Sequence, residues 1–92
     1  MNWHVYIILC SDETLYTGIT TDVNRRLRQH ATGRGAKYFR GRQPKALIYL
    51  ESGFDRSGAA KREAAIKALS RSQKQALIQL PGNAAASITA SP

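Results

Sequence analysis

The segment Trp3–Cys10 constrains the fold most tightly, because it is apolar at almost every position. It reads WHVYIILC and is rich in β-branched and aromatic residues, which favour β-strands. A strand that has no polar side is buried on both faces, so we expect it in the centre of a sheet. A chain of 92 residues has room for one modest core. The other elements of the domain are therefore expected to cover both faces of this central strand.

Two more strands and three helices are expected along the chain. Ser-Asp-Glu at positions 11–13 favours a turn into a second β-rich run, Thr14–Thr20, so an antiparallel hairpin is expected at the start. A third strand is expected at Lys45–Ser52, after a basic stretch, 33–44, that is too irregular to assign. The first expected helix runs from Val23 to about Ala31, after a cap at Thr21 or Asp22. The second begins after a cap at Asp55 or Ser57 and ends at about Leu69. A third, short helix is expected from Ser70 or Ser72 to near Pro81.

This order of elements, β-β-α-β-α-α, predicts an α+β fold with a three-stranded antiparallel sheet flanked by helices. The initial hairpin and the small number of strands exclude a doubly wound parallel sheet. Residues 1–80 are predicted to form a single domain. Residues 81–92 are small, polar and unpatterned, so a frayed tail without function is expected there.

The charge balance favours a polyanionic partner. Fourteen Lys and Arg against six Asp and Glu give a net charge of +8 and a sequence pI of about 10.3. Each phosphate that Lys or Arg neutralises releases counterions from a nucleic acid. An anionic membrane surface is the alternative, but it calls for large apolar residues opposite the charges of a cationic helix. The expected basic helices carry mostly Ala, Val, Leu and Ile, so nucleic acid is the favoured partner.

The sole cysteine and the N-terminal residues indicate the cellular compartment of the protein. Cys10 is expected to be a buried small hydrophobe, and one cysteine excludes an internal disulfide or a cysteine-rich zinc site. The first ten residues lack a basic region and a long apolar run, so neither a signal peptide nor a membrane span is expected. The sequence thus predicts a cytoplasmic protein.

Metal-assisted hydrolysis of a phosphodiester needs at least one protein oxygen ligand, and Glu63 is the best candidate. It lies in the middle of the second expected helix, at the border of the apolar face, with the small Ala59 and Ala60 beside it. The alternative is a surface ion pair with Lys67, four residues on. The other five carboxylates fit turns, helix caps or a strand end: Asp12, Glu13, Asp22, Glu51 and Asp55.

Arg26 and His30 are four residues apart, so they share one face of the first helix. Arg26 can hold a phosphate and stabilise charge in a transition state, and His30 can move a proton or contact a phosphate. The alternative is a solvated arginine and a cation at the C-terminal end of the helix.

The tyrosines of the hairpin are expected to lie together. If Cys10 is opposite Thr14, the even-numbered residues share one face, which places Tyr6 and Tyr16 close to Gly18. Two phenols there can hydrogen-bond a water or a phosphate. Ordinary core packing is the alternative.

The loop GRGAKYFRGR interleaves basic and aromatic residues, a pattern that suits contact with a nucleic-acid backbone and stacking on bases. A solvated flexible loop is the alternative, and its glycines do not form a phosphate-binding fingerprint. The candidate nucleic-acid-binding residues are Arg26, Arg34, Lys37, Arg40 and Arg42, with the aromatic Tyr38 and Phe39 between them.

Together these residues resemble the GIY-YIG nuclease domain family over roughly residues 3 to 79, and especially its short, stand-alone bacterial YhbQ-like members (UPF0213). Two departures from the family pattern are His4 in place of a glycine and Thr17 in place of an isoleucine. The matching landmarks, in order, are His4-Val5-Tyr6, Tyr16-Thr17-Gly18, Arg26 and His30 within NRRLRQH, the following GRGAKY, and Glu63 after Ala60-Lys61-Arg62.

The resemblance implies a role for each landmark. Glu63 would hold a single divalent ion, Mg²⁺ or Mn²⁺. Tyr16 or Tyr6 would orient or deprotonate the attacking water, with the tyrosine of the second motif favoured. Arg26 would stabilise the pentavalent phosphate, and His30 would assist proton transfer or contact the phosphate.

The expected function is a metal-dependent endonuclease that hydrolyses DNA in preference to RNA, with low intrinsic sequence specificity, in DNA repair or processing. Two alternatives remain. One is a binding module that no longer cleaves, and the other is a nuclease subunit that is active only with a protein partner supplying the target.

Overall fold

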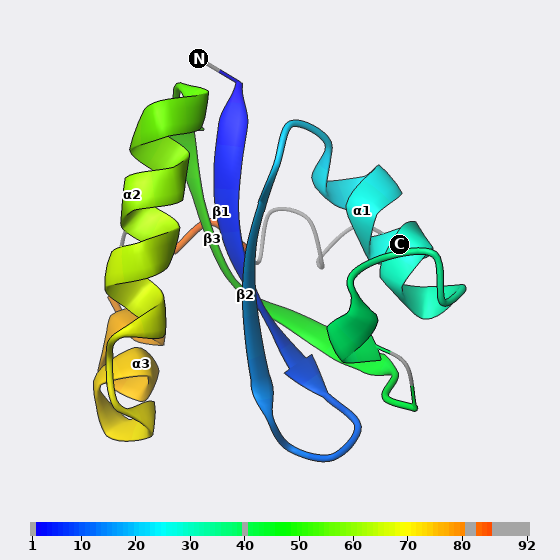
Figure 1. Ribbon diagram of the computed structural model, residues 1–92. Helices are drawn as coiled ribbons and strands as arrows, with labels where there is room; N and C mark the ends of the chain where they lie inside the picture. The colour runs from blue at the N-terminus through cyan, green and yellow to red at the C-terminus, as the bar shows by residue number, and fades with distance from the viewer. Residues whose placement is uncertain (1, 40, 81–82, 86–92) are drawn as a thin grey trace.

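The computed structural model describes residues 2–39, 41–80 and 83–85. The order of elements confirms the predicted α+β class (Figure 1), and the first strand and first helix have the predicted bounds. None of the described helices is long and apolar enough to cross a membrane. The elements are β1 (Trp3–Cys10), β2 (Leu15–Thr20), α1 (Val23–Ala31), the short 3₁₀ helix η1 (Lys37–Phe39), β3 (Pro44–Phe54), α2 (Arg56–Lys67) and α3 (Arg71–Ile78).

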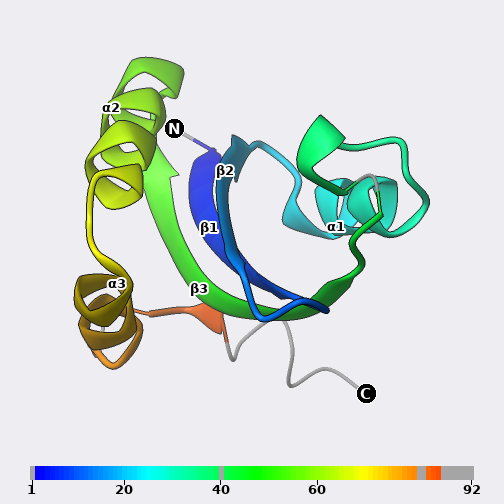
Figure 2. The ribbon, with the colours of Figure 1, turned by 60° about the horizontal axis from the view of Figure 1, so that its bottom comes forward.

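The sheet has the order β2-β1-β3, and both pairings are antiparallel, so β1 is central as predicted. The amide N of Cys10 donates to the carbonyl of Thr14 (2.9 Å), and Tyr6 lies opposite Gly18, which confirms the predicted hairpin register. The third strand is longer than expected at both ends. Three register shifts interrupt its pairing with β1, and Figure 2 shows the strong curvature of β3.

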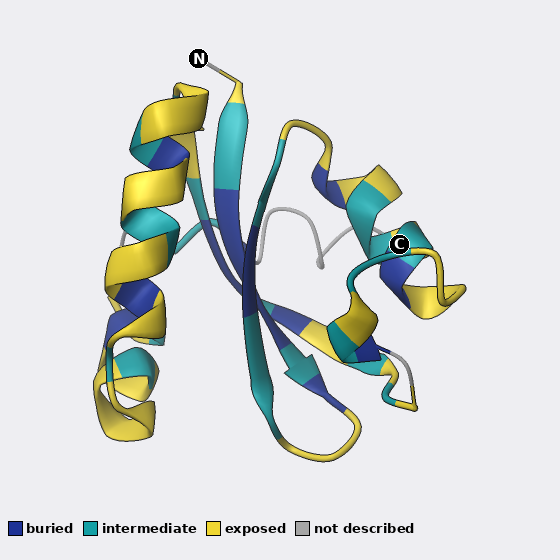
Figure 3. Ribbon diagram, in the orientation of Figure 1, coloured by how far each residue is buried: buried dark blue, intermediate teal, exposed yellow. Residues whose placement is uncertain are grey.

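Helices α2 and α3 cover one face of the sheet, and α1 with η1 covers the other (Figure 1). The alternation of strand side chains explains this layering, because β1 sends even-numbered residues to one face and odd-numbered residues to the other. Both sets are buried, as the dark run along β1 in Figure 3 shows. Tyr6, Ile8 and Cys10 belong to the core beneath α1, whereas Val5 and Ile7 belong to the core beneath α2 and α3.

Side-chain caps settle where the helices begin. Asp22 accepts a hydrogen bond from the amide of Arg25 (3.1 Å) at the start of α1, and Asp55 accepts one from the amide of Gly58 (2.6 Å) at the start of α2. Ser70 forms a reciprocal capping box at the start of α3. Helices α2 and α3 end slightly earlier than expected, at Lys67 and Ile78.

The prediction of a frayed tail is wrong for residues 83–85, which pack against β3. The side chain of Asn83 accepts from the amide of Leu50 (3.0 Å) and donates to the carbonyl of Ile48 (2.8 Å). The amide of Ala84 donates to the carbonyl of Leu50 (2.9 Å), and Ala85 is buried. The rest of the predicted tail, 81–82 and 86–92, lies outside the described residues.

Candidate active site

Three of the candidate side chains form a cluster of rings beneath α1. Tyr6 comes from the middle of β1, Tyr16 from β2 and His30 from the last turn of α1. The ring centroids lie 6.3 Å apart for Tyr6 and Tyr16, 6.1 Å for Tyr6 and His30, and 5.4 Å for Tyr16 and His30. The predicted proximity of these groups is therefore present in the fold.

Gly18 makes this arrangement possible. A Cβ atom at this position would lie 2.5 Å from the phenolic oxygen of Tyr6 and 3.0 Å from Cε2 of Tyr16. Non-bonded atoms do not approach so closely, so any side chain at position 18 would displace the Tyr6 phenol from its place over β2. The glycine is thus a requirement of the site and not only of the hairpin.

His30 is completely buried and held at both ring nitrogens. Its Nδ1 accepts a hydrogen bond from the amide of Ala36 (3.3 Å), and its Nε2 lies 2.9 Å from the phenolic oxygen of Tyr6. A neutral imidazole that accepts at Nδ1 carries its proton on Nε2. The imidazole therefore donates to the Tyr6 oxygen, and the phenolic hydrogen of Tyr6 is left for a different acceptor.

The loop that follows α1 fixes this imidazole, a feature that sequence reasoning missed. An added Cβ at Gly35 would lie 2.0 Å from Nδ1 of His30, so the backbone of the loop is in close contact with the ring. Phe39 covers the imidazole with its centroid at 4.2 Å. The glycine just beyond the expected helix was the available signal, but spacing alone did not connect it to His30.

Burial sets the resting protonation of the cluster. Burial, together with a smaller effect of the positive charge of Arg26, lowers the pKa of His30 to about 4. The pKa of Tyr6 is raised, mainly by burial and then by Tyr16, and the carboxylate of Glu63 adds to this, whereas Arg26 lowers it. At neutral pH, His30 is therefore neutral and Tyr6 keeps its proton.

The lowered pKa of His30 predicts a loss of stability in mild acid. Between about pH 6.5, where an unperturbed histidine titrates, and about pH 4, the unfolded chain binds a proton that the folded chain excludes. The free energy of unfolding should therefore fall as the pH is lowered through this window. Urea titrations of the wild type and of His30→Gln at several pH values measure it, and an equal slope in both proteins would contradict the assignment.

Arg26 lies on α1 and Glu63 on α2, and both act electrostatically on Tyr6 of the ring cluster. Arg26 donates from Nη1 to Oε1 of Gln29 (3.0 Å), which orients its guanidinium, and its charge acts on the pKa of Tyr6. Glu63 is partly exposed, with 24% of its side-chain surface accessible, and it also acts electrostatically on Tyr6. Helices α1 and α2 flank the edge strand β2 (Figure 1). The helices that carry Arg26 and Glu63 therefore lie on either side of that edge strand.

The predicted alternative for Glu63 is also present, since its Oε2 lies 3.4 Å from Nζ of Lys67. The described residues contain no group of three or more His, Cys, Asp or Glu side chains that could hold a metal. A single carboxylate does not suit a tetrahedral zinc site. It does fit Mg²⁺ or Mn²⁺, because Mg²⁺ keeps several water ligands and takes the rest from one or two carboxylates and from phosphate oxygens.

The described cations of the basic loop differ in their surroundings. Arg34 and Lys37 are exposed, as a phosphate contact requires. Arg42 is partly exposed and already has partners: its Nε lies 2.6 Å from Oδ2 of Asp12, and its guanidinium lies over the ring of Tyr38, 4.3 Å from the centroid. Contact of Arg42 with a phosphate stays a prediction, and such a contact would compete with the carboxylate of Asp12.

Phe39 departs from the expected role in base stacking. It is buried against His30 and Tyr16 and so belongs to the core, whereas Tyr38 is half-buried beneath the guanidinium of Arg42. Arg40, the remaining candidate of this loop, lies outside the described residues.

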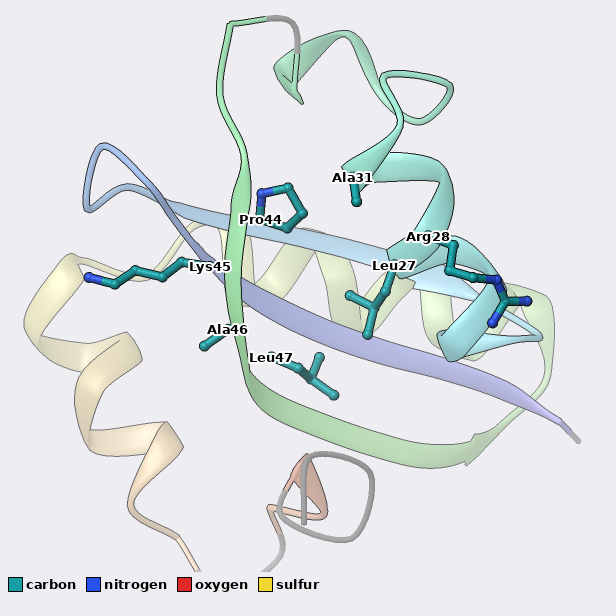
Figure 4. Close-up of a pocket in the computed structure, with 7 residues that line it drawn as sticks. All are labelled: Leu27, Arg28, Ala31, Pro44, Lys45, Ala46 and Leu47. Atoms are coloured by element: carbon teal, nitrogen blue, oxygen red, sulfur yellow. The ribbon is translucent and has the colours of Figure 1, made fainter. Parts of the chain in front are cut away.

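Two hollows of about 280 Å³ each flank α1. The first lies between α1 and β3 (Figure 4) and is lined by mostly aliphatic side chains, including Leu27, Ala31 and Leu47; neither tyrosine of the site takes part. The second is polar and includes Arg26. Only the second hollow adjoins the candidate site.

Comparison with known proteins gives the class that this fold and this cluster define. Residues 2–76 match the model of the GIY-YIG catalytic domain, a nuclease family. The chain belongs to the GIY-YIG family. Within it, the chain is similar to proteins of the UPF0213 group, whose names state no activity.

The similarity covers most of each protein. A UPF0213 protein of Halobacterium salinarum is 58% identical over 74 residues, which cover 80% of this chain and 96% of the relative. The solution NMR structure of a UPF0213 protein from Bacillus halodurans is 46% identical, with a TM-score of 0.57, and covers 89% of this chain and 87% of its own. A solution NMR structure of an E. faecalis protein is 43% identical, with a TM-score of 0.58 and coverage of 83% and 81%.

Proposed function

We propose that this protein is a divalent-metal-dependent endonuclease that hydrolyses phosphodiester bonds in DNA with low intrinsic sequence specificity. The observation that supports this most directly is the hydrogen bond from the buried His30 to Tyr6, at a site on which both Arg26 and Glu63 act electrostatically. A module that only binds nucleic acid has no need of a buried imidazole and phenol held in one tautomer. A nuclease needs groups that position a water and move its proton.

In the proposed reaction each side chain has one task. Arg26 contacts a non-bridging oxygen of the scissile phosphate and stabilises the charge of the transition state. Tyr6 or Tyr16 orients the attacking water. The tyrosine that accepts the proton of the water would have to be a phenolate beforehand, with its own proton released to solvent, and the positive charges of Arg26 and of a bound ion would favour that form. The N–H that His30 donates to Tyr6 acts against the burial that raises the pKa of this phenol. Tyr16, the tyrosine of the second motif, stays the favoured base.

Glu63 is the residue proposed to hold Mg²⁺ or Mn²⁺. When bound, the ion supplies positive charge to the phosphate and to the neighbouring phenols. This positive charge would lower the pKa of Tyr6, which burial otherwise keeps above its ordinary value.

Nicking of supercoiled plasmid and cleavage of single-stranded DNA test the proposal. We expect the purified protein to cut in Mg²⁺ or Mn²⁺ and to stop when EDTA is added. RNA of matched sequence in the same assay tests the preference for DNA. Absence of cleavage with either ion on every DNA form would contradict an endonuclease that acts alone.

The net charge of +8 supports a second candidate, a basic module that binds nucleic acid without cutting it, or a subunit that cuts only with a targeting partner. Exposed Arg34 and Lys37 provide contacts for such binding. This candidate predicts an affinity for DNA that falls steeply with salt in the absence of any cleavage. Cleavage that appears only after a cellular partner is added would identify the subunit. For the nuclease that acts alone and for the nuclease subunit, the proposed role is in DNA repair or processing.

A further inference from the structure

The two helical layers differ in how their positive charges are paired. The layer of α1 and η1, residues 22–39, carries five cations and a single carboxylate, that of Asp22. This carboxylate accepts a hydrogen bond from the amide of Arg25, so it caps the start of α1. Within the described residues, none of the five cations forms an ion pair. They are Arg25, Arg26, Arg28, Arg34 and Lys37.

The layer of α2 and α3 holds most of its cations in contacts within the protein. Arg62 and Lys67 are both ion-paired with glutamates. The guanidinium of Arg56 lies over the ring of Trp3, 5.9 Å from the centroid. Arg71 donates from Nη1 to the backbone carbonyl at position 13 (2.8 Å). Positive charge that is free to meet a polyanion is therefore concentrated on the α1 side of the molecule.

Helix α1 presents two of these arginines on its outer surface. Arg25 and Arg28 are exposed, and because they are three residues apart they are neighbours on the surface of the helix. Arg25 also lines the same polar hollow as Arg26, whose charge acts on Tyr6 of the candidate site. A chain of phosphates that passes Arg26 can therefore continue over Arg25 and Arg28.

The chemistry of this surface fits a phosphate backbone better than an anionic membrane. A helix that lies in a membrane surface needs large apolar side chains on its exposed face. The apolar residues Val23 and Leu27 of α1 pack into the core of the domain instead. Guanidinium groups match the oxygens of phosphates with their fork of donors. The exposed residues of α1 are basic, polar or small, namely Asn24, Arg25, Arg28 and Ala31.

We propose that the outer face of α1 is a docking surface for the DNA backbone, on which Arg25 and Arg28 contact phosphates next to the one that Arg26 holds. The proposal rests on the proposed nuclease function for the identity of the phosphate at Arg26. It places the layer of α2 and α3 on the side of the protein that faces away from the DNA. Because phosphates carry no sequence information, affinity through this surface should not depend on the base sequence.

The salt dependence of DNA binding tests the surface. Binding of a labelled duplex is measured by fluorescence anisotropy in EDTA, which prevents cleavage, over a range of KCl concentrations. Each lost phosphate contact should reduce the slope of log affinity against log salt by about 0.9, so the double variant Arg25→Gln/Arg28→Gln should lose about 1.8. Two duplexes of unrelated sequence should give the same result. A slope equal to that of the wild type would overturn the surface.

The matched control is Lys61→Gln/Lys74→Gln, which removes the same number of positive charges from α2 and α3. This variant should keep the wild-type slope. If both double variants reduce the slope equally, binding follows the net charge alone and the surface is rejected. Vesicles that contain phosphatidylserine should not displace the duplex at the same salt concentration. Displacement by vesicles that is lost in Arg25→Gln/Arg28→Gln would identify a membrane surface as the partner and overturn the proposal.

The two proposals fail separately. Cleavage in Mg²⁺ by a protein whose salt slope is unaffected by Arg25→Gln/Arg28→Gln would reject the docking surface and keep the nuclease. A slope that is reduced only in this variant, without cleavage in any ion, would keep the docking surface and reject the nuclease.

Discussion

Replacement of Glu63 by Gln is expected to reduce metal-dependent DNA cleavage by at least about 100-fold, because it removes the carboxylate proposed to hold the ion. The isosteric amide keeps the shape of the side chain but not its charge. DNA affinity in EDTA should stay equal to that of the wild type or rise slightly, since a negative charge is lost beside the phosphate. The measurements are initial rates of plasmid nicking over a range of Mg²⁺ concentrations and binding isotherms in EDTA.

Lys67→Ala is the matched control for this experiment. It breaks the same ion pair, whose atoms lie 3.4 Å apart, but leaves the carboxylate in place. If Glu63 serves only as a surface partner of Lys67, the two variants should behave alike, with small changes in stability. If Glu63 holds the metal, only Glu63→Gln loses cleavage. Wild-type rates in Glu63→Gln would reject its proposed role.

Gly35→Ala is expected to abolish the arrangement of His30, although the substitution adds a single methyl group. The added Cβ would overlap Nδ1 of His30 at 2.0 Å, and the imidazole cannot move freely because it is buried between Phe39 and Tyr16. We expect a loss of stability of about 1–3 kcal/mol, typical of overpacking. Cleavage should fall by about 100-fold or more, the usual contribution of a positioned acid–base group.

Nitrogen NMR of the imidazoles separates loss of positioning from simple destabilisation. In the wild type, His30 should show an unprotonated Nδ1 and a protonated Nε2 at neutral pH. Gly35→Ala should change this pattern under conditions where the protein is still folded. Gly33→Ala is the control: this glycine has a φ of 77° and nothing within 4 Å of an added Cβ, so only stability should fall, by about 1 kcal/mol. An unchanged His30 signal in Gly35→Ala would contradict the proposed contact.

The parts of the fold that follow from local periodicity could be predicted from the sequence. The apolar run of β1 identified the central strand, and the period of two along a strand placed Tyr6, Tyr16 and Gly18 together once the register was chosen. The period of the helix did the same for Arg26 and His30. These are relations between residues whose geometry is fixed by one element or one hairpin.

The parts that depend on contacts distant in sequence could not be predicted. Arg42 pairs with Asp12, thirty positions away, so its charge looked available from sequence alone. Phe39 looked like an exposed aromatic in a basic loop, but the fold turns it onto His30. Asn83 lies in a stretch with no pattern, and its hydrogen bonds exist only because β3 offers an unpaired edge.

The contacts of Asn83 also bear on the solubility of shortened forms of the chain. Strand β3 is one of the two outer strands of the sheet, and Figure 2 shows residues 83–85 beside it. Their hydrogen bonds occupy the amide and carbonyl of Leu50 and the carbonyl of Ile48, which a strand from another molecule would otherwise use. A protein truncated after α3 would expose that edge of β3 to other molecules. Self-association through β3 is therefore expected in such shortened forms.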